Sequence, residues 1–254
     1  MKMKTRNRTA LLVTLLISCT ILSCKKEEID SLKVGLIAYY PFNGNAIDES
    51  GNNLNGTVTN AIPESDRFGN PNSAFGFDGN NGTERYISSN IGANDTITFC
   101  VWFKSPSPET YYPSIINYGT TRSTHIQVLG DQPTYIREGR VGKIWVGSVL
   151  VEGSTWSTYI ESDKNYADNN WHFLVTTFVP HDNLYLYIDN ELVGSYEYGE
   201  SYPSDGVLYI GREINDNAAG DIHETHFKGI IDDIRIYNRS LTNEELLRLF
   251  SESE

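Results

Sequence analysis

The sequence predicts an all-β fold, a sandwich of antiparallel strands that ends in one short helix. From Gly35 onward, short apolar or aromatic runs alternate with clusters of Gly, Asn, Asp, Ser and Pro, which is typical of strands joined by turns. The same region has no second long hydrophobic span and no clear internal repeat. Only its C-terminal end has a convincing helical pattern.

The expected strands follow one another along this whole region. They are Leu36–Phe42, Ala74–Phe77, Ile97–Lys104, Ser114–Tyr118, His125–Leu129, Arg140–Val146, Trp171–Val179, Leu184–Ile188, Glu191–Tyr196, Val207–Ile210 and Gly229–Tyr237. In Ile97–Lys104 the alternation predicts one core face and one mixed face, and we expect Cys100 on the mixed face to be a small packed thiol. The dipeptide Asp189-Asn190 is expected to form a tight hairpin turn.

The last expected strand contains an unusual charge. Strict alternation places Ile230, Asp232, Ile234 and Ile236 on one face, which we expect to point into the core. Asp232 is then a carboxylate on an apolar face, and a buried charge without a partner costs several kcal/mol. The strand therefore predicts a compensating group near Asp232.

The helix that follows has clear start signals. Thr242 is the expected N-cap, and Glu245 three residues later completes a capping box. Leu241 and Leu246 occupy the two positions of a hydrophobic staple. These residues predict a short surface helix at the end of the chain.

Residues 1–23 are expected to be a lipoprotein signal peptide. Basic residues precede an apolar stretch at 11–22 that is too short to span a bilayer. The run Ile21-Leu22-Ser23-Cys24 resembles a bacterial lipobox, which would make Cys24 the acylated first residue of the mature chain; Leu16-Ile17-Ser18-Cys19 is a weaker alternative. Residues 35–254 then form one folded domain.

Residues 24–34 are expected to be the lipidated cysteine and a linker. Lys25-Lys26-Glu27-Glu28 resembles the charged stretch that follows the lipidated cysteine in surface lipoproteins of Bacteroides-like bacteria, and it also fits a plain solvated linker. Together these features predict a lipid anchor in the outer membrane and exposure at the cell surface.

The charge balance excludes some classes of partner. Removing residues 1–23 takes away four of the 20 basic residues and none of the 33 acidic ones, which leaves 16 against 33 and a formal charge of −17. Such a chain does not suit nucleic acid, whose affinity comes from basic residues that neutralise phosphates, but it suits divalent cations. Once Cys24 is lipidated, Cys100 is the one cysteine left, so no disulfide framework is expected.

Four stretches of the sequence resemble a known family. They are Ile37–Gly51 with Asn55-Gly56, Arg67–Asn70 through Phe77-Asp78-Gly79, Asn170–Phe173 through Ile188–Asn190, and Ile231–Asn238. In these stretches the chain resembles a bacterial laminin-G-like (LamG-like) domain of the concanavalin A-like lectin/glucanase superfamily. The resemblance implies a two-sheet jelly roll with one concave face. It implies no single activity, because this fold serves lectins, hydrolases and adhesion modules.

The resemblance also implies a structural Ca²⁺ at Asp232. In many jelly rolls of this superfamily such an ion lies between the N-terminal strand and an aspartate of the final strand. Asn43, Asn45 and Asp48 offer oxygen ligands on the loop after the first strand, and calcium takes six to eight such oxygens. The alternative is that Asp232 accepts backbone N–H bonds or pairs with an arginine, and that the loop residues only form turns.

Carbohydrate binding requires exposed aromatic planes beside polar side chains. The segment 111–166 is rich in Tyr and Trp, and it is where the family pattern is weakest. We predict that Trp145, Trp156, Tyr118 and Tyr159 face a ligand. The alternative is that these residues pack in strands, because Tyr and Trp are also strand formers.

The run Asp221–His226 contains two histidines three residues apart, but it lacks a clear third metal ligand. We expect it to be a solvated loop before the last strand.

Catalysis has little support in the sequence. Family 16 glycoside hydrolases of this fold carry paired acids along one strand, and retaining cleavage needs two carboxylates about 5 Å apart. Glu161-Ser-Asp163 lacks a third acid, and Asp232 and Asp233 are adjacent and should face opposite sides. No Ser/His/Asp arrangement is apparent either.

The sequence therefore predicts a cell-surface lipoprotein that binds a glycan or glycoconjugate without cleaving it. The alternatives are an adhesion or protein-interaction module without sugar binding, and a glycoside hydrolase of the same superfamily. No feature of the sequence specifies an oligomeric state.

Overall fold

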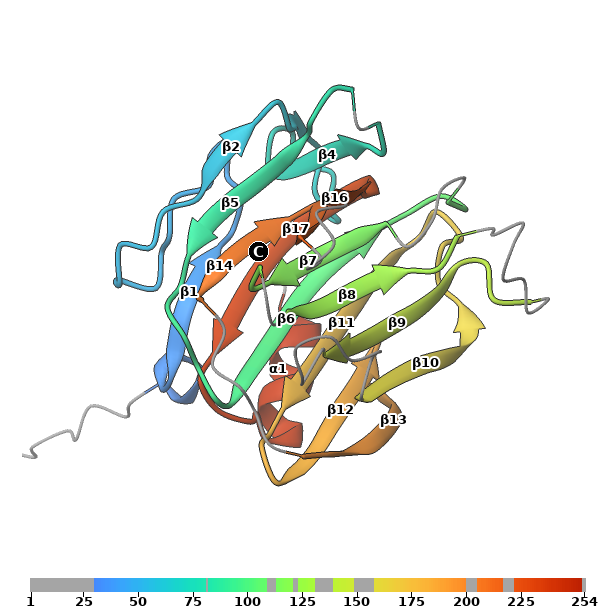
Figure 1. The fold of residues 1–254 in the computed structure, drawn as a ribbon. Coiled ribbons are helices and arrows are strands. Elements are labelled where there is room, and N and C mark those ends of the chain that lie inside the picture. The colour runs from blue at the N-terminus through green and yellow to red at the C-terminus, as the bar shows by residue number, and fades with distance from the viewer. Residues whose placement is uncertain are drawn as a thin grey trace, which may run out of the picture. The chain divides into compact units, whose positions relative to one another are not determined.

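The chain forms a sandwich of two antiparallel sheets within Ser31–Glu254 (Figure 1). The computed structural model describes residues 30–80, 82–108, 113–120, 123–130, 139–148, 158–199, 205–216 and 222–252. The compact unit starts with a 3-10 helix at Ser31–Lys33, whose Leu32 is buried. The predicted two-sheet fold is confirmed.

One sheet has eight strands, in the order β13-β12-β11-β6-β17-β4-β3, with β1 also paired to β17. Their bounds are β1 (Leu36–Tyr40), β3 (Ile62–Glu64), β4 (Ala74–Asp78), β6 (Ile97–Lys104), β11 (Trp171–Phe178), β12 (Asp182–Ile188), β13 (Glu191–Tyr198) and β17 (Lys228–Tyr237). The turn between β12 and β13 is formed by Asp189 and Asn190, both at positive φ, as predicted.

The other sheet has seven strands, in the order β10-β9-β8-β7-β14-β5-β2. Their bounds are β2 (Thr57–Thr59), β5 (Tyr86–Asn90), β7 (Ser114–Tyr118), β8 (Thr124–Val128), β9 (Lys143–Ser148), β10 (Thr158–Asn165) and β14 (Val207–Ile210). After β14 the chain continues through Gly211 into a separate hairpin of β15 (Arg212–Asp216) and β16 (Ile222–His226).

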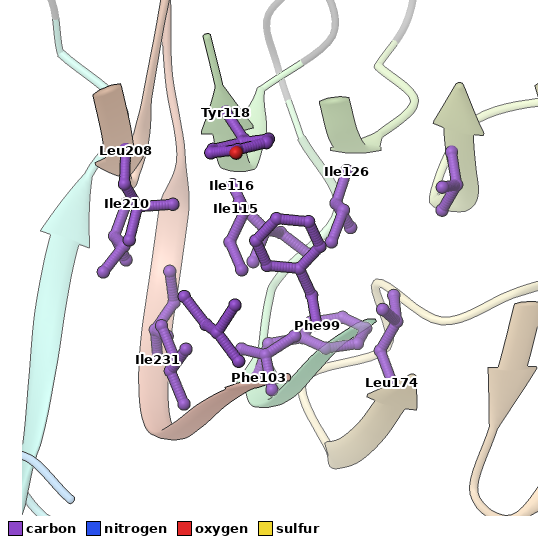
Figure 2. Close-up of a cluster of buried hydrophobic side chains, with 14 of the residues drawn as sticks. Phe99, Phe103, Ile115, Ile116, Tyr118, Ile126, Leu174, Leu208, Ile210 and Ile231 are labelled. Carbon is purple, nitrogen blue, oxygen red and sulfur yellow. The ribbon is translucent and has the colours of Figure 1, made fainter. Parts of the chain in front are cut away.

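The core lies between the two sheets (Figure 2). Phe99 and Phe103 of β6 point toward the seven-stranded sheet, where Ile116, Ile126 and Leu208 are fully buried. Such close packing makes the inward face of each strand apolar, so side chains at the intervening positions must face outward.

The sequence analysis missed several short or mostly polar strands, and one loop assignment was wrong. Every predicted strand is present, with ends within three residues of those expected, but β2, β3, β5, β10, β15 and β16 were not predicted. The run 221–226, expected to be a loop, contains β16, because residues 222–226 pair with β15. Strands of three residues, or strands of mostly polar residues, do not show the apolar alternation on which the predictions depend.

The alternation predicted for the last strand is interrupted by a bulge. The register of β17 on β6 shifts between Asp232 and Arg235, and Asp233 has a φ of 50°. Ile231, Ile234 and Ile236 are all in the core, so the predicted single face of even-numbered residues is wrong. The bulge also means that Asp232 and Asp233 do not face opposite sides of the sheet.

The C-terminal helix α1 (Asn243–Ser251) covers part of the outer face of the eight-stranded sheet. Its Leu246 and Leu249 pack with Cys100, Phe173 and Tyr237. Thr242 and Glu245 form the predicted capping box. The mixed face of β6 is therefore a second apolar contact surface, and Cys100 is a buried thiol as expected.

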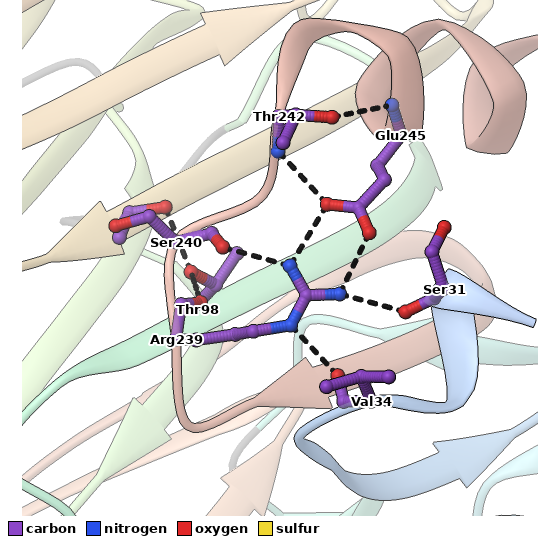
Figure 3. A network of polar contacts seen from close by, with 8 residues as sticks. Ser31, Val34, Thr98, Arg239, Ser240, Thr242 and Glu245 are labelled. Carbon is purple, nitrogen blue, oxygen red and sulfur yellow. Dashed lines mark hydrogen bonds and ion pairs between the residues drawn. The ribbon is translucent and has the colours of Figure 1, made fainter. Parts of the chain in front are cut away.

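Arg239 joins this helix to the start of the domain (Figure 3). Its guanidinium donates to the carbonyls of Ser31, Val34 and Ser240 and to both carboxylate oxygens of Glu245, at 2.7–2.9 Å. A bidentate pair of this kind fixes orientation as well as distance. One side chain thus holds together the first and last segments of the domain.

Candidate functional site

The outer face of the seven-stranded sheet carries a row of polar and aromatic side chains. Tyr159 of β10 pairs with Gly147 of β9, Gly147 pairs with His125 of β8, and His125 pairs with Asn117 of β7. Their sequence neighbours are core residues, namely Ile116, Ile126, Val146 and Ile160. The row therefore faces away from the core.

Two aromatic rings stack at one end of this row. Trp145 of β9 and Tyr159 of β10 have ring centroids 5.7 Å apart and planes 20° apart. Gly147 makes room for the indole, because a Cβ at this position would lie 2.4 Å from Trp145. Trp145 is 6% exposed, whereas Tyr159 is 47% exposed. Tyr159 thus presents an aromatic surface to solvent, with Trp145 beside it.

A buried polar network lies next to the aromatic pair. Gln127, opposite Trp145 on β8, donates to Glu213 Oε2 at 2.5 Å. Thr225 Oγ1 donates to the same oxygen at 3.3 Å, and His125 Nδ1 lies 3.4 Å from Glu213 Oε1. Asn117 Nδ2 is 3.3 Å from His125 Nδ1. We call Trp145, Tyr159, Asn117, His125, Gln127 and Glu213 the outer-face site.

Ser123 extends the network on the other side of the histidine. Its Oγ lies 2.5 Å from His125 Nε2, so Ser123, His125 and Glu213 follow one another in the order of a nucleophile, a base and an acid. Ser123 and His125 are both buried, however, so the hydroxyl is not presented to solvent.

Basic residues flank the aromatic pair. Glu161, opposite Trp145 on β10, accepts from Arg140 Nε at 2.8 Å and lies 3.7 Å from Lys143 Nζ. All three side chains are partly exposed. The aromatic pair is therefore bordered on one side by partly exposed charged side chains and on the other by buried polar groups.

The predicted ligand-facing residues have different positions. Trp145 and Tyr159 lie together in the outer-face site, and Trp156 lies outside the described residues. The structure corrects the position of Tyr118, which is in the core between the sheets, with its hydroxyl donating to the Gly92 carbonyl at 2.7 Å. Tyr118 shares the inward face with Ile116, and a count of aromatic residues could not reveal this orientation.

Sequence reasoning missed Asn117, His125, Gln127 and Glu213. The alternation His125-Ile126-Gln127-Val128 contained a signal, because it places two polar side chains on the face opposite two core residues. Glu213 had no such signal, since it reaches Gln127 only through the hairpin that follows Gly211.

Asp232 lies in a second polar site, a pocket of about 380 Å³ that Asn43, Asp66 and Arg67 also line. Arg67 donates to Asp232 Oδ2 at 2.7 Å and to Asp233 Oδ2 at 2.8 Å. The bulge at Asp233 allows both carboxylates to reach one guanidinium. The compensating group near Asp232 in this structure is therefore an arginine, which was the alternative to calcium.

Burial and, to a smaller extent, the neighbouring carboxylate of Asp233 raise the pKa of Asp232 to about 7, although Arg67 opposes both. Burial also favours the neutral form of Asp48, but hydrogen bonds outweigh it and hold the pKa of Asp48 below its usual value. The donors include the N–H groups of Tyr39 and Leu54. Asp48 and Asp232 are thus in electrostatically different environments.

The fit to calcium is poor at these residues. The Asp232 carboxylate already contacts a guanidinium, Asp48 accepts several hydrogen bonds, and Asn45 Oδ1 accepts from Ile47 N–H at 2.8 Å. Asn43 lines the same pocket as Asp232. Among the described residues, no group of three or more His, Cys, Asp or Glu side chains is arranged to hold a metal ion. These contacts favour the arginine alternative, and the chelator experiment below decides between it and the calcium expected from the sequence.

We expect the melting temperature of the chain to be the same in calcium and in excess chelator. Arg67 already supplies the positive charge that a calcium ion would bring to Asp232. An ion that binds only the folded chain stabilises it by about 2.7 kcal/mol at a hundredfold excess over its Kd. A melting temperature that falls with chelator, and no longer does so in Asp232→Asn, would restore the calcium assignment.

Cys24 lies outside the described residues. In the part of the chain that the structure does describe, no helix is long and apolar enough to cross a membrane.

A family model described as the concanavalin A-like lectin/glucanases superfamily (Laminin_G_3) matches residues 77–247, more than half of the chain. No curated protein shows significant similarity to the chain.

Several solved structures share the fold. The binding domain of botulinum neurotoxin DC in complex with SialylT aligns at a TM-score of 0.64 and 14% identity, over 86% of this chain and 51% of that one. The same toxin domain in complex with rat synaptotagmin II aligns at a TM-score of 0.64 and 17% identity, over 87% of this chain and 52% of that one. Domain 4 of AbnA, an arabinanase of Geobacillus stearothermophilus, in complex with arabinotriose, gives 0.56 and 18%, over 85% and 98%. The chain spans about half the length of the toxin domains, and at these identities the likeness concerns the fold alone.

Proposed function

Because the chain belongs to the concanavalin A-like lectin/glucanases superfamily, we propose that it binds a carbohydrate or glycoconjugate, without cleaving it, at the outer-face site. The observation that carries the proposal is the exposed Tyr159 ring beside a buried set of amide, imidazole and carboxylate groups. An aromatic plane can pack on the C–H face of a sugar, while fixed polar groups select its hydroxyls.

The solved structures support this proposal in a general way. The arabinanase domain was solved with arabinotriose, and the toxin domain with SialylT. The toxin domain was also solved with synaptotagmin II, which favours protein binding as the second candidate function. A glycoside hydrolase has less support, since the Glu161 carboxylate is paired with Arg140 and Lys143 and Ser123 is buried.

Replacing Tyr159 by alanine should weaken glycan binding at least about tenfold, because aromatic side chains at the centre of an interface often contribute about 2 kcal/mol or more. The measurement is binding to a printed array of neutral and acidic oligosaccharides, arabinotriose among them, followed by calorimetry on the strongest ligand.

Tyr196→Ala is the matched control, because Tyr196 is a similarly exposed tyrosine on β13 of the other sheet. Equal losses in the two variants would place the ligand elsewhere. Binding of a protein from the cell surface, with no glycan bound, would favour the interaction module.

We further propose that residues 1–23 are removed and that Cys24 carries a lipid that holds the domain at the outer surface of the cell. The lipobox-like run before Cys24 supports this. Cys24→Ala should abolish incorporation of a labelled fatty acid, and continued labelling of this variant would reject the anchor.

A further inference from the structure

The polar side chains of the outer-face site are outward-facing and yet buried. Asn117 and His125 are 0% exposed and Gln127 is 3% exposed, although all three lie on the face of the sheet opposite the core. Glu213, from the β15–β16 hairpin, supplies the carboxylate that Gln127 and His125 contact. The chain thus places one of its own side chains on this part of the sheet.

Glu213 satisfies this polar set incompletely. Among the described residues, Asn117 Oδ1 is buried and has no hydrogen-bond partner. An ionised carboxylate only accepts hydrogen bonds, so Glu213 can receive the Gln127 amide but can offer nothing to a carbonyl oxygen. If this part of the sheet served only to pack the β15–β16 hairpin, apolar side chains would do so without leaving a buried acceptor unpaired.

A sugar hydroxyl would satisfy the same groups better. It can accept from the Gln127 amide and also donate to Asn117 Oδ1, because a hydroxyl is both donor and acceptor. A uronate or sialate carboxylate at this place would leave Asn117 Oδ1 unpaired in the same way as Glu213. The chemistry therefore selects a neutral sugar that presents neighbouring hydroxyls.

We propose that Asn117, His125 and Gln127 form a subsite for a neutral sugar, and that Glu213 occupies this subsite when no glycan is bound. The inference rests on the proposed function and adds to it the class of sugar and an intramolecular competitor. The subsite adjoins the aromatic pair, because Gln127 is the direct strand neighbour of Trp145. Rotation of the Glu213 side chain away from Gln127 would open the subsite to a sugar.

A competitor of this kind lowers the apparent affinity by the fraction of time that the subsite is open. Minor conformations are commonly populated at roughly 0.1–10%, so removing the competitor should tighten binding about tenfold or more. Removing a side chain from a binding site ordinarily weakens binding. The sign of the effect therefore distinguishes this proposal from an ordinary ligand contact by Glu213.

The test compares wild type, Glu213→Ala and Glu213→Gln on the same array of neutral and acidic oligosaccharides, followed by calorimetry. Glu213→Ala should bind the neutral ligands of the wild type about tenfold or more tightly, while Glu213→Gln, which keeps the length of the side chain and adds an N–H donor for Asn117 Oδ1, should bind them no more tightly than wild type. Glu191→Ala is the matched control, since this exposed glutamate lies on β13 of the other sheet.

A second variant keeps the test decisive if Glu213→Ala does not fold. Asn117→Leu removes the unpaired acceptor, so it should fold with equal or higher stability and lose the neutral glycans. Unchanged or weaker binding by folded Glu213→Ala, equal gains in Glu213→Gln, or full binding by Asn117→Leu would each overturn the inference while leaving the proposed function in place. Absence of glycan binding in every variant and in wild type would overturn the proposed function itself.

Discussion

Replacing Arg67 by methionine should lower the free energy of unfolding by about 3–5 kcal/mol, the usual cost of removing one partner of a buried ion pair. Asp232 and Asp233, whose side chains are 3% and 12% exposed, would lose the guanidinium that contacts both of them. Methionine keeps much of the packing against Phe68 and Trp102, over whose rings Arg67 lies. Urea unfolding at neutral pH measures the change.

The same variant should depend more strongly on pH. The pKa of Asp232 is raised to about 7 in the folded chain, so between about pH 4 and pH 7 the folded state binds more protons than the unfolded state. The contribution of this group to stability is therefore fully present below about pH 4 and is lost as the pH rises through about 7. Without Arg67 the loss of stability with rising pH should be larger. Asp232→Asn, which cannot ionise at this position, should remove this pH dependence.

Arg85→Met is the control for Arg67. Arg85 lies 3.3 Å from Asp78, but both side chains are about one quarter exposed, so this pair should contribute less than about 1 kcal/mol. Equal losses in the two variants would mean that burial of Asp232 does not decide the strength of its ion pair.

Replacing Arg239 by methionine should lower the free energy of unfolding by about 2–4 kcal/mol. Hydrogen bonds to charged groups contribute about 1.5–3 kcal/mol each and several are lost together, but water replaces part of them because the Arg239 side chain is 25% exposed. The variant would detach helix α1 from the segment Ser31–Val34. Hydrogen exchange should show a larger increase in rate, relative to wild type, in α1 than in β6.

The Arg239 contacts also predict the acid sensitivity of the wild type. The hydrogen bonds from Arg239 lower the pKa of Glu245 to about 2. The stability that this group contributes is present above its ordinary pKa of 4.5 and is lost as the pH falls through about 2. Arg239→Lys, which cannot make the bidentate contact, should recover only part of the loss. Full recovery with lysine would contradict the role of the guanidinium geometry.

The strands with strong apolar alternation and the capped helix could be predicted, because their signals are local. In β6 the alternation gave the core face correctly, and the mixed face became the contact surface for α1. The bulge at Asp233 could not be predicted, because it depends on pairing with β6 and on Arg67, which is 165 residues away from Asp232 in sequence. One inserted residue was enough to make the face assignment of β17 wrong.

The candidate site could be predicted only in part, for a similar reason. The aromatic excess indicated Trp145 and Tyr159, which do lie together. The same criterion selected Tyr118, because composition does not distinguish the inward from the outward face of a strand. The contact of Gln127 with Glu213 joins residues 86 positions apart, and no local pattern encodes it.

The most direct test of the outer-face site is the ¹⁵N spectrum of the tryptophan indoles during titration with the neutral oligosaccharide that binds most strongly on the array. Each signal is assigned by replacing one tryptophan with phenylalanine. Trp145 lies in the outer-face site, whereas Trp102 stacks on Phe250 of α1 against the other sheet. Binding at the outer-face site should shift the Trp145 signal and leave that of Trp102 unchanged. A saturable shift of Trp102 with no change at Trp145 would contradict the assignment of the site.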